Sequence, residues 1–132
     1  MSSVFNIAVS GLQAQSRRLE VSADNVANVS SLGVHPDTQL AKPEGFAPQH
    51  TVFTSQVLGG VAASTTPITP AAYLSYQPDH PGADPDGLVP LPNVSLEREM
   101  VDQIQALRLF QANVATIQTQ DRMMGTLLDM VS

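Results

Sequence analysis

The chain has 132 residues, a formal net charge of −6 and an apolar content of 42%, which fits a single domain of ordinary composition. Its six basic residues form no cluster, so it lacks the Lys- and Arg-rich surface that a nucleic-acid-binding protein needs. The absence of cysteine excludes disulfides, thiolate metal sites and a cysteine nucleophile. No run approaches the ~18 apolar residues of a membrane span. We therefore expect no nucleic acid among the partners and no direct membrane span.

The first predicted element is a helix over residues 3–29. Every seventh position carries a large apolar residue, whereas the positions three residues later are mostly small or polar. So narrow a stripe suits close packing between helices of an assembly, although an amphipathic helix on a small core stays an alternative. Gly11 weakens this helix by roughly 1 kcal/mol relative to alanine, and it offers a neighbouring element a close approach. The residues of the stripe are Phe5, Leu12, Leu19 and Val26.

The middle of the chain, residues 33–92, holds all ten prolines and four of the six net negative charges. Such a segment cannot be one long helix, because proline interrupts helices. Short β-capable runs at 51–57, 72–76 and 87–91 are separated by turn signals, which predicts a small, irregular β-hairpin region. We expect residues 65–70 to be its most flexible part.

The last predicted element is a helix over residues 96–131. Two rows of heptad positions run along it, and eight of these ten positions are apolar. A helix of this length spans ~54 Å, more than the width of so small a domain, so much of its apolar seam must face a partner. The first row is Met100, Leu107, Val114, Asp121 and Leu128, and the second is Gln103, Phe110, Ile117, Met124 and Val131.

These elements predict a mainly α-helical protein. We expect the long N- and C-terminal helices to form an antiparallel coiled-coil-like pair, a discontinuous domain of residues 1–32 and 93–132, with residues 33–92 as the β-hairpin and loop insert. An alignment that sets Phe5 opposite Val131 brings Asp121 within one turn of Arg17 and Arg18. We therefore predict that Asp121 forms a register-setting ion pair with one of these arginines, the alternative being a solvated Asp121.

The sequence predicts no catalytic, cofactor or metal site. His35, His50 and His80 are isolated and lack the spacings of a metal site. The acidic stretch 79–87 matches a calcium loop only weakly, and a turn rich in Asp, Pro and Gly explains it better. No nucleophile elbow, phosphate-binding glycine loop or paired carboxylates stand out. We therefore predict that the chain is not an enzyme.

Both terminal helices resemble signatures of the bacterial flagellar axial proteins. Residues 8–12 and 18–30 are similar to the N-terminal signature, in which a small-Gly-Leu segment leads to Asn-rich turns ending Ala-Asn-Val. Residues 93–101, with 110–113 and 117–119, are similar to the C-terminal motif. The short length and the pattern Asp79-His80-Pro81, Asp86-Gly87 and Pro92-Asn93-Val94 resemble, within that family, the basal-body rod proteins, and among these the short subunits of the proximal rod.

The resemblance implies a structural subunit of the bacterial flagellar basal-body rod, without a cofactor. It would be exported to the periplasmic space by the flagellar type III export apparatus without a cleaved signal peptide. Its terminal helices would polymerise with copies of itself and with other rod proteins into a tubular driveshaft for motility. A soluble coiled-coil adaptor that binds one helical partner and forms no filament stays the alternative. The predicted assembly interface comprises Phe5, Leu12, Leu19, Asn25, Val26, Asn28, Met100, Leu107, Phe110, Asn113, Val114, Ile117, Met124, Leu128 and Val131.

Overall fold

A computed structural model describes residues 2–35 and 45–131. Along the sequence, one long helix precedes four short strands and a second long helix follows them. This order confirms the predicted mainly helical class with β-hairpins between the helices. The predicted helix boundaries hold to within two residues. In chain order the elements are α1 (Ser2–Ala27), β1 (Gln49–Ser55), β2 (Val61–Pro67), β3 (Ala72–Tyr76), β4 (Leu88–Pro92) and α2 (Leu96–Val131).

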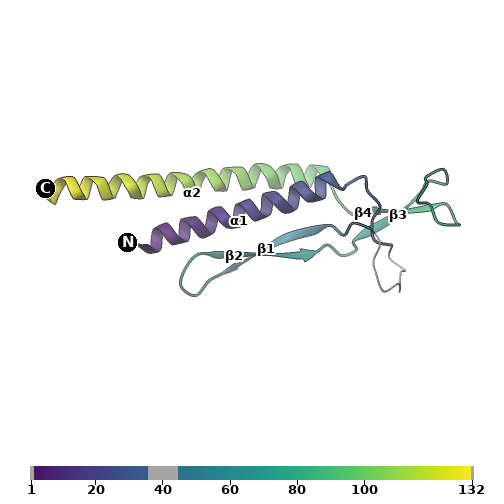
Figure 1. The fold of residues 1–132 in the computed structure, drawn as a ribbon, viewed down its shortest axis with the longest axis horizontal. Helices are drawn as coiled ribbons and strands as arrows, with labels where there is room; N and C mark the ends of the chain where they lie inside the picture. The colour runs from purple at the N-terminus through teal and green to yellow at the C-terminus, as the bar shows by residue number, and fades with distance from the viewer. Residues whose placement is uncertain (1, 36–44, 132) are drawn as a thin grey trace.

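Helix α1 is the central element of the fold. It contacts α2 along one side and both strands of the β1–β2 hairpin along another. Figure 1 shows α1 between these two layers, with β3 and β4 beyond the end of α1 where the chain leaves that helix. We call the end of the helix pair near β3 and β4, where α1 finishes and α2 begins, the closed end. The opposite end, where α1 begins and α2 finishes, is the open end.

Side-chain caps mark the two helix boundaries at the closed end. The Asp24 carbonyl at the end of α1 accepts hydrogen bonds from both the backbone N–H (3.1 Å) and the side-chain amide (2.9 Å) of Asn28. At the start of α2 the Ser95 hydroxyl accepts from the Arg98 amide (3.4 Å) and donates to the Glu97 carboxylate (2.8 Å). Both sets of hydrogen bonds join residues close together in the chain.

The insert holds two separate antiparallel sheets, β1–β2 and β3–β4, where the sequence predicted one irregular hairpin region. Strand β2 also corrects the prediction that residues 65–70 are flexible, because Thr65, Thr66 and Pro67 pair with β1. Pro67 is tolerated because it ends a strand, where no ladder donor is required. The other end of β2 is fixed by α1, since the Ser10 hydroxyl accepts a hydrogen bond from the Val61 amide (3.1 Å).

The buried apolar residues of the described chain are small. No phenylalanine or tyrosine among the described residues is buried. The helices therefore pack closely without the large side chains that dominate most cores. The buried apolar residues are Ala8, Ala14, Val21, Ala72, Val89 and Ala106.

Candidate assembly interface

A buried polar network joins three elements at the closed end. Asn25, only 2% exposed, donates from its amide nitrogen to the Gln49 carbonyl (2.7 Å) and to Glu99 Oε1 (2.8 Å). Its amide oxygen accepts from the Gln49 backbone N–H (3.1 Å). The Ser22 hydroxyl donates to the Glu99 carbonyl (3.2 Å). One asparagine therefore ties α1 to the start of β1 and to the first turn of α2, and buried polar groups of this kind are costly to leave unpaired.

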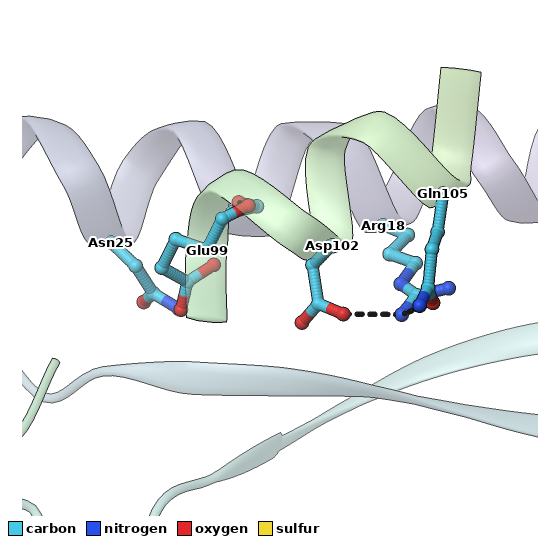
Figure 2. Close-up of polar contacts among 6 residues, drawn as sticks. Arg18, Asn25, Glu99, Asp102 and Gln105 are labelled. Carbon is cyan, nitrogen blue, oxygen red and sulfur yellow. Dashed lines mark hydrogen bonds and ion pairs between the residues drawn. The ribbon is translucent and has the colours of Figure 1, made fainter. Parts of the chain in front are cut away.

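A second polar contact lies between the helices about two turns along from this network. The Arg18 guanidinium forms an ion pair with Asp102 and donates to Gln105 Oε1 (3.1 Å). Figure 2 shows these side chains, with Asn25 and Glu99, on the side of the helix pair that faces the strands. The arginine side chain is mostly buried and the aspartate side chain about half exposed. A partly exposed ion pair stabilises a fold only slightly, so this one contributes more to the alignment of the two helices than to stability.

A third contact sets the distance between the helices. A Cβ atom placed on Gly11 would lie 2.8 Å from both amide atoms of Asn113. The Asn113 side chain of α2 therefore approaches the backbone of α1 closely at Gly11, as the lack of a Cβ there allows. Asn113 is held there by a hydrogen bond from its amide to the Leu109 carbonyl (2.9 Å).

These contacts correct the predicted register pair. Arg18 pairs with Asp102 and Arg17 with Glu20, so neither arginine meets Asp121 and the prediction is wrong within the chain. The flush alignment would set Gly11 opposite residue 125, but Gly11 faces Asn113, twelve residues earlier or ~18 Å along the helix. The helices are aligned at the closed end instead, where Asn25 meets Glu99.

The distribution of apolar residues on the helix pair is inverted relative to a globular protein. The buried residues of the two helices are small or polar, whereas most of the large apolar ones are exposed and the others half-buried. Met100, Ile104 and Leu107 follow the i, i+4, i+7 spacing of one helix face and are 60%, 55% and 53% exposed. The other exposed ones are Val4, Phe5, Ile7 and Leu19 on α1, and Leu96, Val101, Leu109, Phe110, Met123, Met124, Leu127, Leu128 and Met130 on α2.

On α1, the predicted interface residues divide between exposed, half-buried and buried positions. Phe5 and Leu19 are exposed, and Leu12 and Val26 are half-buried. The structure places Asn25 in the internal network, where its amide is fully used, so it is not available to a neighbouring molecule. Asn28 is also used internally, as the cap of α1.

On α2, the predicted residues divide between the contact with α1 and the outer surface. Asn113 lies against Gly11, and Val114 and Ile117 are half-buried. The side chain of Val131 lies outside the described residues. The remaining predicted residues, Met100, Leu107, Phe110, Met124 and Leu128, are exposed.

Sequence reasoning missed the partners that hold the helices together. Arg18 was predicted to pair, but with the wrong aspartate, and Ser22, Glu99 and Asp102 were not singled out. A heptad count could not find them because it weighs only apolar spacing. The Asn-rich turn at the end of α1 was the available signal, since asparagine in a helix interior is unfavourable unless its amide has a use.

The described residues give little support to a ligand site. A hollow of about 450 Å³ separates the helix pair from β1, and charges of both signs line it. Within residues 2–35 and 45–131, no three His, Cys, Asp or Glu side chains gather closely enough to hold a metal ion. In the acidic stretch 79–87, the Asp84 carboxylate accepts from the backbone amides of Asp86 (3.0 Å) and Leu88 (2.8 Å), as in an ordinary turn. Neither helix of the described chain has a stretch long and apolar enough to cross a membrane.

Comparison with known proteins identifies the family. A family model for flagella basal body rod proteins matches residues 5–33, and one for the C-terminal region of flagellar basal body rod FlgEFG proteins matches residues 87–130. The flagellar basal-body rod protein FlgC of Yersinia enterocolitica is 41% identical over 122 residues, which cover 92% of this chain and 90% of the relative. FlgC of Salmonella typhimurium is 39% identical over the same shares. FlgC of Agrobacterium fabrum is 33% identical over 134 residues, covering 96% and 93%.

The matches agree with the geometry. Both family models fall on the terminal helices, which carry the exposed apolar residues, and the relatives align across the β strands as well. These relatives are structural rod proteins and not enzymes. The chain therefore belongs to the FlgC family of flagellar basal-body rod proteins and is a structural subunit of the flagellar basal body.

Proposed function

We propose that the chain polymerises through the outer faces of α1 and α2, with copies of itself and with other rod proteins, into the tubular proximal rod. The observation that carries the proposal is the inverted distribution of apolar residues. Small and polar contacts hold α1 against α2, which leaves the large apolar side chains for neighbouring subunits. In the assembly these faces pack in the manner of a coiled coil.

The energetics favour assembly over the isolated chain. Fully burying one large apolar side chain contributes ~1.5–3 kcal/mol, and a whole small domain is stable by only ~5–15 kcal/mol. Met100, Ile104 and Leu107 are 53–60% exposed, so burying all three contributes roughly half of this value for each, or ~2–5 kcal/mol, which approaches the stability of a small domain. A rod that transmits torque requires this kind of stability between subunits.

The small size of the buried apolar residues also favours export of the chain in an unfolded state. A chain whose buried apolar residues are mostly alanine and valine unfolds at low cost, as passage through a narrow export channel requires. We propose that the flagellar type III export apparatus carries the chain, without a cleaved signal peptide, to the rod in the periplasmic space.

The variant Leu107→Asp tests the use of the outer face. Leu107 is 53% exposed, so an aspartate there leaves the monomer intact but puts an unpaired carboxylate into an interface between subunits. We expect normal export, no incorporation into basal bodies and lost motility. Arg108→Asp is the matched control, because it adds the same side chain one residue along, where the wild type is exposed and already charged.

Two results would contradict the proposal. Leu107→Asp rods that assemble as well as those of Arg108→Asp would show that this face is not an interface. A wild-type chain that forms only a defined one-to-one complex with a helical partner, and is absent from basal bodies, would favour the soluble adaptor instead.

A further inference from the structure

The tip of the β1–β2 hairpin carries two apolar side chains that are almost fully exposed in the described chain. Val57 and Leu58 are 104% and 96% exposed. Turns in water are normally built from polar residues, glycine and proline, because nothing is gained by exposing large apolar groups there. The pair therefore requires an explanation outside the monomer.

The tip is held in a defined position. The Gln56 amide donates to the Gly60 carbonyl (3.1 Å), and the Gly59 amide to the Gln56 carbonyl (3.0 Å). Gly59 and Gly60 have positive φ angles of 87° and 98°, and a Cβ on Gly60 would lie 2.5 Å from the Ser10 hydroxyl of α1. Val57 and Leu58 thus project from a turn that is fastened to α1.

A second apolar surface lies at the same open end, on the last turns of α2. Helix α1 has 26 residues and α2 has 36, and alignment at the closed end leaves the surplus of α2 beyond the start of α1. Figure 1 shows α2 extending past the N-terminus. Residues 121–130 are all exposed, and we call them the α2 overhang; its large apolar residues include Met123, Met124, Leu127 and Met130.

The overhang continues a surface that is already an interface. Asn113 and Ile117 lie on the side of α2 that α1 covers, and Met124 follows Ile117 by seven residues on that same side. Where α1 stops, the same side of α2 becomes uncovered. A neighbouring molecule that packs there extends the α1–α2 contact across the boundary between subunits.

The tip and the overhang are complementary in chemistry. The hairpin from Gln49 to Pro67 contains no Asp, Glu, Lys or Arg, so it can seat on an apolar surface without burying a full charge. Methionine side chains are flexible and polarisable and adapt to a small branched pair such as Val57 and Leu58. The two surfaces are on separate layers, since α1 lies between α2 and the hairpin (Figure 1).

We infer that the hairpin tip of one copy of this chain docks on the α2 overhang of a neighbouring copy. Where two neighbours do not exchange the contact reciprocally, two different surfaces on one subunit make a head-to-tail contact, and it continues from copy to copy as a rod requires. Each copy then covers one apolar surface of its neighbour and has its own covered in turn. This inference rests on the proposed assembly and names one contact within it.

Cysteine crosslinking tests the contact in assembled rods. The chain contains no cysteine, so introduced thiols are the only ones it carries. The double variant Leu58→Cys with Met124→Cys, treated with a short bifunctional maleimide in isolated basal bodies, should give covalent multimers of this chain. Each single variant should give none. Leu58→Cys with Val101→Cys is the matched control, because Val101 is exposed on α2 near the closed end.

The outcomes separate this contact from rod assembly itself. Rods that assemble from the double variant without crosslinked multimers would overturn the contact and leave the proposed function standing. Crosslinks only to a different rod protein would overturn the choice of a second copy as the occupant. If Met124→Cys blocks assembly, Leu127→Cys replaces it on the same overhang, and the same results apply. Absence of the wild-type chain from basal bodies would instead count against the proposed function.

Discussion

Replacing Gly11 with alanine probes the close contact between Gly11 of α1 and Asn113 of α2. Alanine improves the helix propensity of this position by roughly 1 kcal/mol. The added Cβ, however, would lie 2.8 Å from both amide atoms of Asn113, well inside van der Waals contact. Overpacking of this kind typically costs ~1–3 kcal/mol, because the asparagine must leave its position or the helices must separate. We expect Gly11→Ala to destabilise the chain by ~0–2 kcal/mol.

A double-mutant cycle isolates the clash. Asn113→Ala alone should change stability little, since it removes one exposed hydrogen bond to the Leu109 carbonyl and adds a better helix former. In the Asn113→Ala background, Gly11→Ala should become stabilising, which gives a coupling of ~1–3 kcal/mol between the two positions. Urea denaturation followed by circular dichroism measures all four chains.

Gly125 supplies the matched control. A Cβ on Gly125 would meet nothing within 4 Å, so Gly125→Ala should show only the gain in helix propensity. Amide hydrogen exchange measures this gain as slower exchange in the last turns of α2. Equal effects of alanine at the two glycines, with no coupling to Asn113, would refute the register and the close approach described for the helix pair.

Three further predictions concern the polar contacts. Asn25→Ala should lower the free energy of unfolding by about 1–3 kcal/mol in urea denaturation, because it leaves Glu99 and backbone groups of β1 buried without their partner; a neutral effect would contradict the network. Asp102→Asn should cost less than about 1 kcal/mol, and the loss should shrink in high salt, since its ion pair with Arg18 is partly exposed; a larger, salt-independent loss would contradict this. The pKa of the Glu97 carboxyl is held below its ordinary value of 4.5 by donation from its own backbone N–H and a neighbouring hydroxyl. The ionised Glu97 carboxylate therefore adds a small contribution to stability above pH 4.5, and this contribution is lost as the pH falls through the lowered pKa. In an acid titration of stability, Glu97→Gln should lack this loss.

Local signals in the sequence predicted the helices well. Periodicity and caps placed both helices to within two residues, and β3 was found at its observed residues. The heptad rows also identified side chains that face outward, such as Phe5 and Leu107. Each of these features depends on residues close together in the chain, where propensity and spacing are informative.

Non-local contacts account for what the sequence did not predict. The register depends on Arg18 meeting Asp102 and on Asn25 meeting Glu99, pairs separated by more than seventy residues. An apolar repeat of seven fits several registers equally well, so polar contacts decide among them. Strand β2 was missed because its two alanines and its proline are poor strand formers, and its pairing with β1 against α1 overrides that preference.

Methionine oxidation measures most directly whether the outer faces of the helices are buried on assembly. Met100, Met123, Met124 and Met130 are all exposed in the free chain, and exposed methionines oxidise readily to the sulfoxide. Mass spectrometry of peroxide-treated protein, free and in isolated basal bodies, gives the extent of oxidation at each position. We expect all four methionines to be oxidised in the free chain and strongly protected in the rod. Equal oxidation in both states would contradict assembly through the outer faces of α1 and α2.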